Sequence, residues 1–135
     1  MNFVSVRVIT GDVARLVEFY ERVTGGSASW ANAEFAEVHT RSCTLAIGST
    51  RTVGLFGPGS ASPATNRSAI LEFIVEDVDT EYERLREWVT EFVTLPTTMP
   101  WGNRALLFRD PDGNLVNLFT PVTDDALKKF ADTPR

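Results

Sequence analysis

Apolar and other residues alternate along the first segment of the chain. Val4, Val6 and Val8 fall at every second position, and Ser5 and Arg7 lie between them. In a strand, alternate side chains point to opposite faces. The pattern therefore predicts a half-buried strand whose valines face a core and whose Arg7 faces the other way.

The next segment has the spacing of an amphipathic helix. Asp12 is a residue type that favours the N-cap, and apolar residues recur at helical spacing from Val13 to Val23. Gly25 and Gly26 follow, and glycine adopts the left-handed conformation that often ends a helix. Short strand-like runs come next, at residues 28–33, 35–40, 43–47 and 52–56.

A connector rich in Gly, Pro, Ser and Ala, residues 57–66, separates this pattern from a second copy. Residues 69–75 read as a strand, and Asp77 is the expected N-cap of the following helix. Further strands are predicted at 92–95, 104–108 and 115–120. A turn at 110–113 joins the last two, and Thr123 opens a short final helix.

The two halves repeat one another. A shift of 65 residues takes the first strand onto 69–75 and Asp12 onto Asp77. At the module ends, a shift of 63 residues places Thr52–Pro58 over Leu115–Pro121. Each half is too small to bury its own sheet, so we expect the halves to share a core.

Composition narrows the possible functions. The chain has 135 residues, 43% of them hydrophobic, which suits a single domain with a real core. The net charge of -5 disfavours nucleic acid as a partner.

No apolar run approaches the ~20 residues of a membrane span, and the N-terminus reads as a strand rather than a secretion signal, so we expect a cytoplasmic protein. Cys43 and His39 are the only cysteine and histidine, and we expect no disulfide and no thiol catalysis.

One local motif carries a family resemblance. The run Pro100–Trp101–Gly102–Asn103–Arg104, followed by 110–119, resembles the C-terminal signature of the glyoxalase / bleomycin-resistance / extradiol-dioxygenase superfamily, also called vicinal oxygen chelate proteins. The resemblance spans roughly residues 2–121. It implies an α+β fold of two tandem βαβββ modules that form an open, cup-shaped mixed sheet with helices outside. Within one domain, 1–135, module 1 is about 2–57, the linker about 57–67, module 2 about 68–121 and a helical tail 122–135.

The resemblance also locates the family's metal positions. Metal-dependent members place one ligand on the first strand and one on the last strand of each module. The matching positions here are Ser5, Gly54, Ile70 and Asn117. None of them offers the imidazole, thiolate or carboxylate that first-row metals require, so we expect no metal and no other cofactor.

The strand faces that would line the cup are mostly apolar, which is typical of a small-molecule site. Arg7 and Glu72 hold equivalent positions in the repeat; either they form an ion pair, or one of them orients a polar ligand. Glu72 could also act as a general base. The candidate ligand-binding residues are Phe3, Arg7, Trp30, Phe56, Ile70, Glu72, Trp101 and Asn117.

Trp101 is a candidate for ligand contact, and Trp30 and Arg104 each have two possible roles. Trp101 lies in a loop where antibiotic-binding relatives stack aromatic side chains on planar drugs. Trp30, with Phe35, is a candidate for the cup rim, with core or dimer packing as the alternative. Arg104 either binds an anion or pins its loop.

Three functions follow from this pattern. The first is metal-free binding of a small, partly aromatic organic molecule, as in bleomycin- and mitomycin-binding relatives, with drug sequestration or resistance as the result. The second is a lyase, isomerase or dioxygenase of the same superfamily with an atypical site. The third is a module for protein association. We favour the first, without catalysis, and expect the two-fold homodimer common among relatives of this size.

Overall fold

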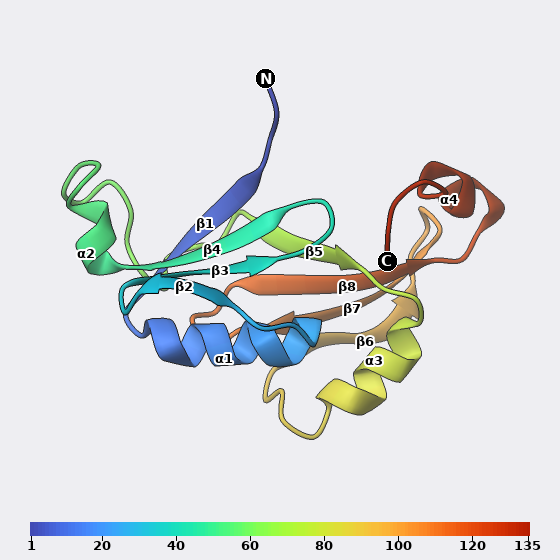
Figure 1. Cartoon of the computed structure of the whole chain (residues 1–135). Helices are drawn as coiled ribbons and strands as arrows, with labels where there is room; N and C mark the ends of the chain where they lie inside the picture. Colours follow the sequence, from blue (N-terminus) through green and yellow to red (C-terminus); the bar gives the residue numbers. More distant parts are fainter. The chain divides into compact units, whose positions relative to one another are not determined.

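The computed structural model describes all residues, 1–135, and the chain divides into two compact units (Figure 1). Unit 1 comprises residues 1–66 with 111–113, and unit 2 comprises 67–110 with 114–135. Each unit holds one four-stranded sheet that is open rather than closed into a barrel. The predicted α+β class and the tandem βαβββ modules are confirmed. None of the helices has the length and apolar character that crossing a membrane requires.

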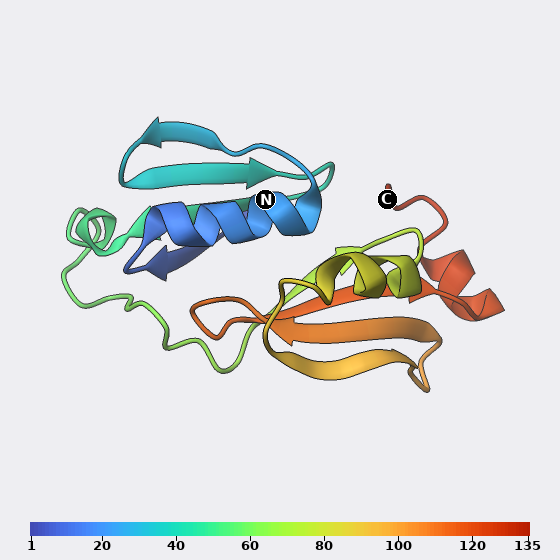
Figure 2. The same cartoon turned by 90° about the horizontal axis from the view of Figure 1, so that it is seen from below.

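Unit 1 forms its sheet in the strand order β1-β4-β3-β2. β1 and β4 run parallel, and the other neighbours run antiparallel. One face of the sheet is covered by α1, as both views show (Figures 1 and 2). Its elements are β1 (Ser5–Thr10), α1 (Val13–Thr24), β2 (Ser29–Asn32), β3 (Phe35–His39), β4 (Thr44–Ser49) and α2 (Thr50–Val53).

Helix α1 has the ends that the sequence predicts. The side chain of Asp12 accepts a hydrogen bond from the backbone N–H of Arg15, and Gly25 ends the helix at a φ of 73°. Leu16 and Tyr20 are among its fully buried side chains, and α1 packs on β3 and β4, where Ile47 is also buried. Burial of this apolar stripe holds the helix against the sheet.

Unit 2 repeats this plan with the strand order β5-β8-β7-β6. Again the first and last strands of the module, β5 and β8, are parallel, and the remaining pairs are antiparallel. Its elements are β5 (Ile70–Ile74), α3 (Val78–Leu85), β6 (Phe92–Thr98), β7 (Asn103–Arg109), β8 (Leu115–Pro121) and α4 (Asp124–Lys129).

Helix α3 covers one face of the second sheet (Figure 2). Asp77 caps it as predicted, by accepting hydrogen bonds from the backbone N–H groups of the first turn. The rings of Tyr82, Phe92 and Phe108 meet edge to face, with centroids 5.3 and 6.0 Å apart. Such aromatic contacts add to the apolar burial that joins α3 to the sheet.

The short helix α2 corrects one prediction. Residues 52–56 are not a strand, because Ser49 ends β4 and caps a helix: its side chain accepts from the N–H of Arg51, and Thr52 donates its hydroxyl to the Ser49 carbonyl. Val53 is then buried and Leu55 exposed. The last strand of the first module is therefore β4. Its counterpart β8 begins 71 residues later, from Thr44 to Leu115, and the 63-residue alignment of the module ends is wrong.

The C-terminal helix α4 packs on its own unit. Thr123 caps it, as predicted, by accepting from the N–H of Ala126. The ring of Phe130 lies 5.2 Å from that of Phe119 on β8. The tail thus covers one end of the sheet face opposite α3.

Candidate functional site

Each sheet has one face covered by its long helix, and we call the opposite face the distal face. On the first sheet, the strand register aligns three rows of residues across β1, β4 and β3. The alternate rows hold the buried residues Ala36, Val38 and Ile47, on which α1 packs. Ser5 and Arg7 therefore point away from α1, as the alternation predicts. The rows on the distal face are Ser5–Thr44–His39, Arg7–Ala46–Glu37 and Ile9–Gly48–Phe35.

Arg7 is held by two aromatic rings on this face. Its guanidinium carbon lies 4.7 Å from the centre of the Phe35 ring and 5.1 Å from that of Phe56. Phe56 reaches it from the turn after α2 and remains 74% exposed. Both contacts are within the range of cation–π attraction.

Gly48 lies beside Phe35 on this face and is packed against Thr52 of α2. A Cβ added there would lie 3.7 Å from the Phe35 ring and 2.8 Å from the Thr52 hydroxyl. The first distance is an ordinary van der Waals contact, whereas the second is a clash, so the missing side chain leaves the space that Thr52 in α2 occupies. Glycine at this position therefore lets α2 begin directly after β4.

The distal face of the second sheet carries a hydrogen-bonded pair. Glu72 on β5 and Asn117 on β8 are directly opposite in the register. The amide nitrogen of Asn117 donates to Glu72 Oε2 at 2.7 Å, and the other amide atom, Oδ1, is buried without a hydrogen-bond partner. Their neighbours Ile70 and Leu115 are apolar. A buried acceptor without a donor is costly. Thr94 Oγ1, Asn103 Oδ1 and Asp112 Oδ2 are also buried without a hydrogen-bond partner, but Asn117 alone of these four residues is bonded to a carboxylate on the distal face.

The family's metal positions do not fit a metal. In the register of the second module, Asn117 lies on the last strand, and its counterpart on β4 is Ala46. Gly54 was the predicted position, but it lies at the end of α2 and on no strand. The set is therefore Ser5, Ala46, Ile70 and Asn117.

This corrected set still lacks any imidazole, thiolate or carboxylate. His39 is the one histidine; its Nδ1 lies 3.2 Å from Thr44 Oγ1, and its Nε2 lies 3.8 Å from Glu37 Oε2. No group of three or more His, Cys, Asp or Glu side chains is placed to hold a metal ion. His39 and Glu37 together supply only two donors, whereas first-row metals take three or four from proteins.

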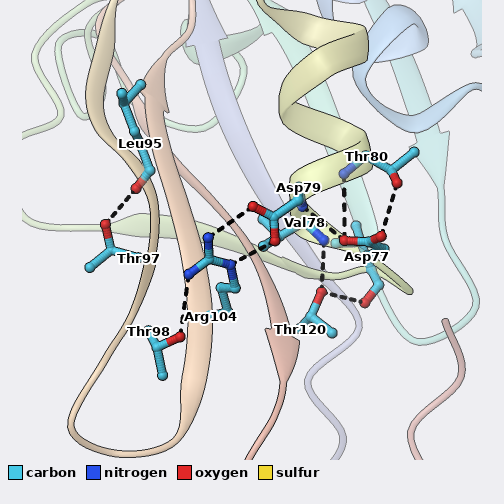
Figure 3. Close-up of polar contacts among 10 residues, drawn as sticks. Asp77, Val78, Asp79, Thr80, Leu95, Thr97, Thr98, Arg104 and Thr120 are labelled. Atoms are coloured by element: carbon cyan, nitrogen blue, oxygen red, sulfur yellow. Dashed lines mark hydrogen bonds and ion pairs between the residues drawn. The ribbon is translucent and has the colours of Figure 1, made fainter.

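Arg104 pins two elements together (Figure 3). Its Nε and Nη2 donate to the two oxygens of Asp79, at 2.6 and 2.9 Å, and its Nη1 donates to Thr98 at 3.4 Å. The hydrogen bonds from Arg104 lower the pKa of Asp79 below its usual value. Of the two interpretations of Arg104, the geometry favours the structural one, since β7 is tied to the first turn of α3.

The predicted aromatic contacts are spread over the chain. Trp101 is 69% exposed in the turn between β6 and β7. Phe3 is 76% exposed just before β1. Trp30 on β2 is in register with Ala36, in the row of Ile47, so it lies on the face of α1 rather than on the distal face. The structure brings Arg7 and Phe56 together, and separately Glu72 and Asn117.

Sequence reasoning missed three features of these faces. It assigned Phe56 to a strand, did not pair Phe35 with Arg7, and did not find the Glu72–Asn117 hydrogen bond. The sequence does contain a signal for Phe35. Phe35 and Glu37 alternate with Ala36 and Val38, which are buried, so the alternation predicts that Phe35 lies on the distal face. The other two depend on a turn and on strand register, which no local pattern contains.

Comparison with known proteins agrees with this geometry. The family model "Glyoxalase/Bleomycin resistance protein/Dioxygenase superfamily" matches residues 2–118. The chain therefore belongs to this superfamily. It is 29% identical over 125 residues to the uncharacterized protein YraH of Bacillus subtilis (strain 168), covering 88% of this chain and 98% of that protein.

Solved structures share the fold. A glyoxalase/bleomycin resistance protein/dioxygenase from Nocardioides is 25% identical, covers 92% of this chain and 85% of its own, and superposes with a TM-score of 0.75. A family enzyme from Burkholderia phytofirmans PsJN reaches a TM-score of 0.81 at 16% identity, with coverage of 90% and 100%. The second likeness concerns the fold alone.

Proposed function

We propose that this protein binds a small, partly aromatic organic molecule on the distal face of its second sheet, without a metal, and thereby sequesters it. The single observation that carries the proposal is Asn117. Its Oδ1 is a buried acceptor without a donor, on a face whose neighbouring residues, Ile70 and Leu115, are apolar. A ligand N–H or O–H would supply the missing hydrogen bond, while the apolar neighbours would bury the rest of the molecule.

The donor chemistry supports the metal-free part of the proposal. Ser5, Ala46, Ile70 and Asn117 offer no charge to offset a divalent cation, and binding alone needs no catalytic group. In this proposal the protein acts in the cytoplasm as a homodimer, without nucleic-acid or membrane partners.

Thermal melts test both parts. A ligand at a hundred times its dissociation constant stabilises the native state by about 2.7 kcal/mol, which is several degrees in a domain of this size. We expect Ni²⁺, Zn²⁺, Mn²⁺ and Fe²⁺ to leave the melting temperature unchanged, and at least one planar organic compound in a panel to raise it. Stoichiometric metal in the purified protein together with a metal-dependent rise would contradict the proposal. So would a panel of planar compounds without any effect.

One observation favours a second candidate, an acid–base enzyme of the superfamily. Asn117 orients the Glu72 carboxylate through Oε2 and leaves Oε1 without a donor from the chain. A carboxylate held in this way could accept a proton from a bound substrate. If the ligand found in the melts is converted, Glu72→Gln should abolish turnover while keeping binding; if it is not converted, the binding function stands alone.

A further inference from the structure

Arg7 is an arginine whose hydrogen-bonding groups are all unused. Four other arginines bond to carboxylates of the chain: Arg51 to Glu34, Arg84 to Glu81, Arg86 to Glu83 and Arg104 to Asp79. Arg7 has ring contacts with Phe35 and Phe56, but no hydrogen bond or ion pair within the chain. Arg15, Arg41 and Arg67 also have no side-chain hydrogen bond or ion pair, so the two ring contacts are what set Arg7 apart.

Arg7 is exposed to solvent, and the groups around it on the distal face are mostly apolar. Its neighbours on the distal face are Ala46 beside it, the Phe35 ring, and Ile9 two residues along β1. Glu37, in the same row, lies 3.8 Å from His39 and outside ion-pair distance of Arg7. The guanidinium is therefore accessible to a ligand, and no carboxylate of the chain is paired with it.

The two rings restrain the guanidinium of Arg7 in a position that suits a carboxylate ligand. Aromatic contacts restrain its position but use none of its five N–H donors, which lie in the plane of the group. That planar set of donors matches the two oxygens of a carboxylate. Because the side chain is already held, less conformational entropy is lost when a ligand binds.

We propose that Arg7, restrained by Phe35 and Phe56, binds the carboxylate of a small organic acid. Phe56, 74% exposed, offers its ring to the apolar body of the same molecule. This inference goes beyond the proposed function: it places an organic carboxylate with an apolar or aromatic body on the first sheet, whereas the proposed function rests on Asn117 of the second sheet.

A matched pair of probes tests the proposal. Benzoate and benzamide have the same ring and nearly the same shape, but only benzoate carries the charge. The measurement is a ¹H–¹⁵N NMR titration of the full chain at millimolar concentrations, with the Nε–H signal of Arg7 followed together with the backbone. We expect benzoate to bind more tightly than benzamide and to shift the Arg7 Nε–H signal.

Variants assign the effect to Arg7. Arg7→Gln should weaken benzoate binding by about tenfold or more, as expected for loss of a charge-assisted pair. The matched control is Arg41→Gln, which makes the same charge change at an exposed turn residue and should leave binding unchanged. Arg7→Lys keeps the charge without the planar donors and should bind with intermediate strength. Phe56→Leu, on an exposed turn, should also weaken binding, and it gives a second readout if Arg7→Gln does not fold.

The outcomes separate this inference from the proposed function. If benzamide binds as well as benzoate, or if Arg7→Gln behaves like Arg41→Gln, the carboxylate inference is wrong while small-molecule binding stands. If inorganic phosphate displaces benzoate at lower concentration than benzoate itself binds, the class of anion is wrong. If neither aromatic probe binds and the wider panel also has no effect, both proposals fail.

Discussion

Arg104 donates two parallel hydrogen bonds to Asp79, from Nε at 2.6 Å and from Nη2 at 2.9 Å, so that β7 and the first turn of α3 are joined by a bidentate ion pair. The two residues are 25 positions apart in the sequence. Arg104 belongs to the segment that resembles the family signature. Its partner gives that residue a structural role, and Trp101 in the same loop remains exposed.

This pair predicts how stability depends on pH. The pKa of Asp79 is lower in the folded chain than in the unfolded chain, because Arg104 stabilises the carboxylate. The pair therefore stabilises the protein fully above about pH 4, the ordinary pKa of Asp, and less as the pH falls below it. Chemical unfolding at several pH values should show a smaller acid loss for Asp79→Asn than for wild type. Asp132→Asn, in the exposed tail, is the control and should follow wild type; identical curves for all three proteins would show that the pair contributes nothing.

A side chain at position 48 should clash with Thr52 and lower the stability of the protein. Gly48→Ala would place a Cβ 2.8 Å from Thr52 Oγ1, and that hydroxyl is committed to the Ser49 carbonyl. We expect a loss of roughly 1–3 kcal/mol in the free energy of unfolding, typical of overpacking. Gly11→Ala, where the added Cβ meets nothing within 4 Å, is the matched control. The Gly48→Ala and Thr52→Ala changes together should cost less than their sum, because the second removes the clash; strict additivity would count against this explanation.

Gly102 predicts an effect at the C-terminal helix. Its φ is 95°, and an added Cβ would lie only 2.0 Å from the hydroxyl of Thr123, the N-cap of α4. Gly102→Ala should therefore combine backbone strain of about 1–3 kcal/mol with loss of the cap. Gly59→Ala has a similar φ of 79° but open space around the Cβ, and it should show the strain alone. The check is hydrogen exchange of the α4 amides, which should become faster in Gly102→Ala only.

Replacement of Asn117 should weaken ligand binding without lowering the stability of the protein. Asn117→Leu removes the buried unpartnered Oδ1 and adds apolar surface, so we expect stability to stay equal or to rise by about 1 kcal/mol. The same change should abolish binding of a ligand that is held by the second sheet. Asn117→Gln, which keeps both the amide donor and the amide acceptor on a longer side chain, should retain part of the binding. A clear loss of stability in Asn117→Leu would mean that the Glu72 hydrogen bond matters more to the fold than to a ligand.

The sequence by itself determined the elements that depend on local spacing. The alternation of Val6 and Val8 with Arg7 indicated β1 and its two faces, and Asp12 with Gly25 marked both ends of α1. The repeat of this pattern near residue 70, capped by Asp77, established the tandem α+β modules. These signals can be read from the chain because each one involves residues only a few positions apart.

Only the tertiary structure decided how the distal faces are built. Thr50–Val53 became a helix because β4 ends at Ser49, which is a consequence of its ladder with β1 and β3. Because β4 ends at Ser49, the family's metal position on the last strand of the first module is Ala46 and not Gly54. Phe56 contacts Arg7 from the turn after α2. The bond between Glu72 and Asn117 likewise depends on the register of β5 and β8. A one-residue change of register would turn these side chains to the other face, so the side-chain partners at the candidate site follow from strand pairing and not from any local pattern.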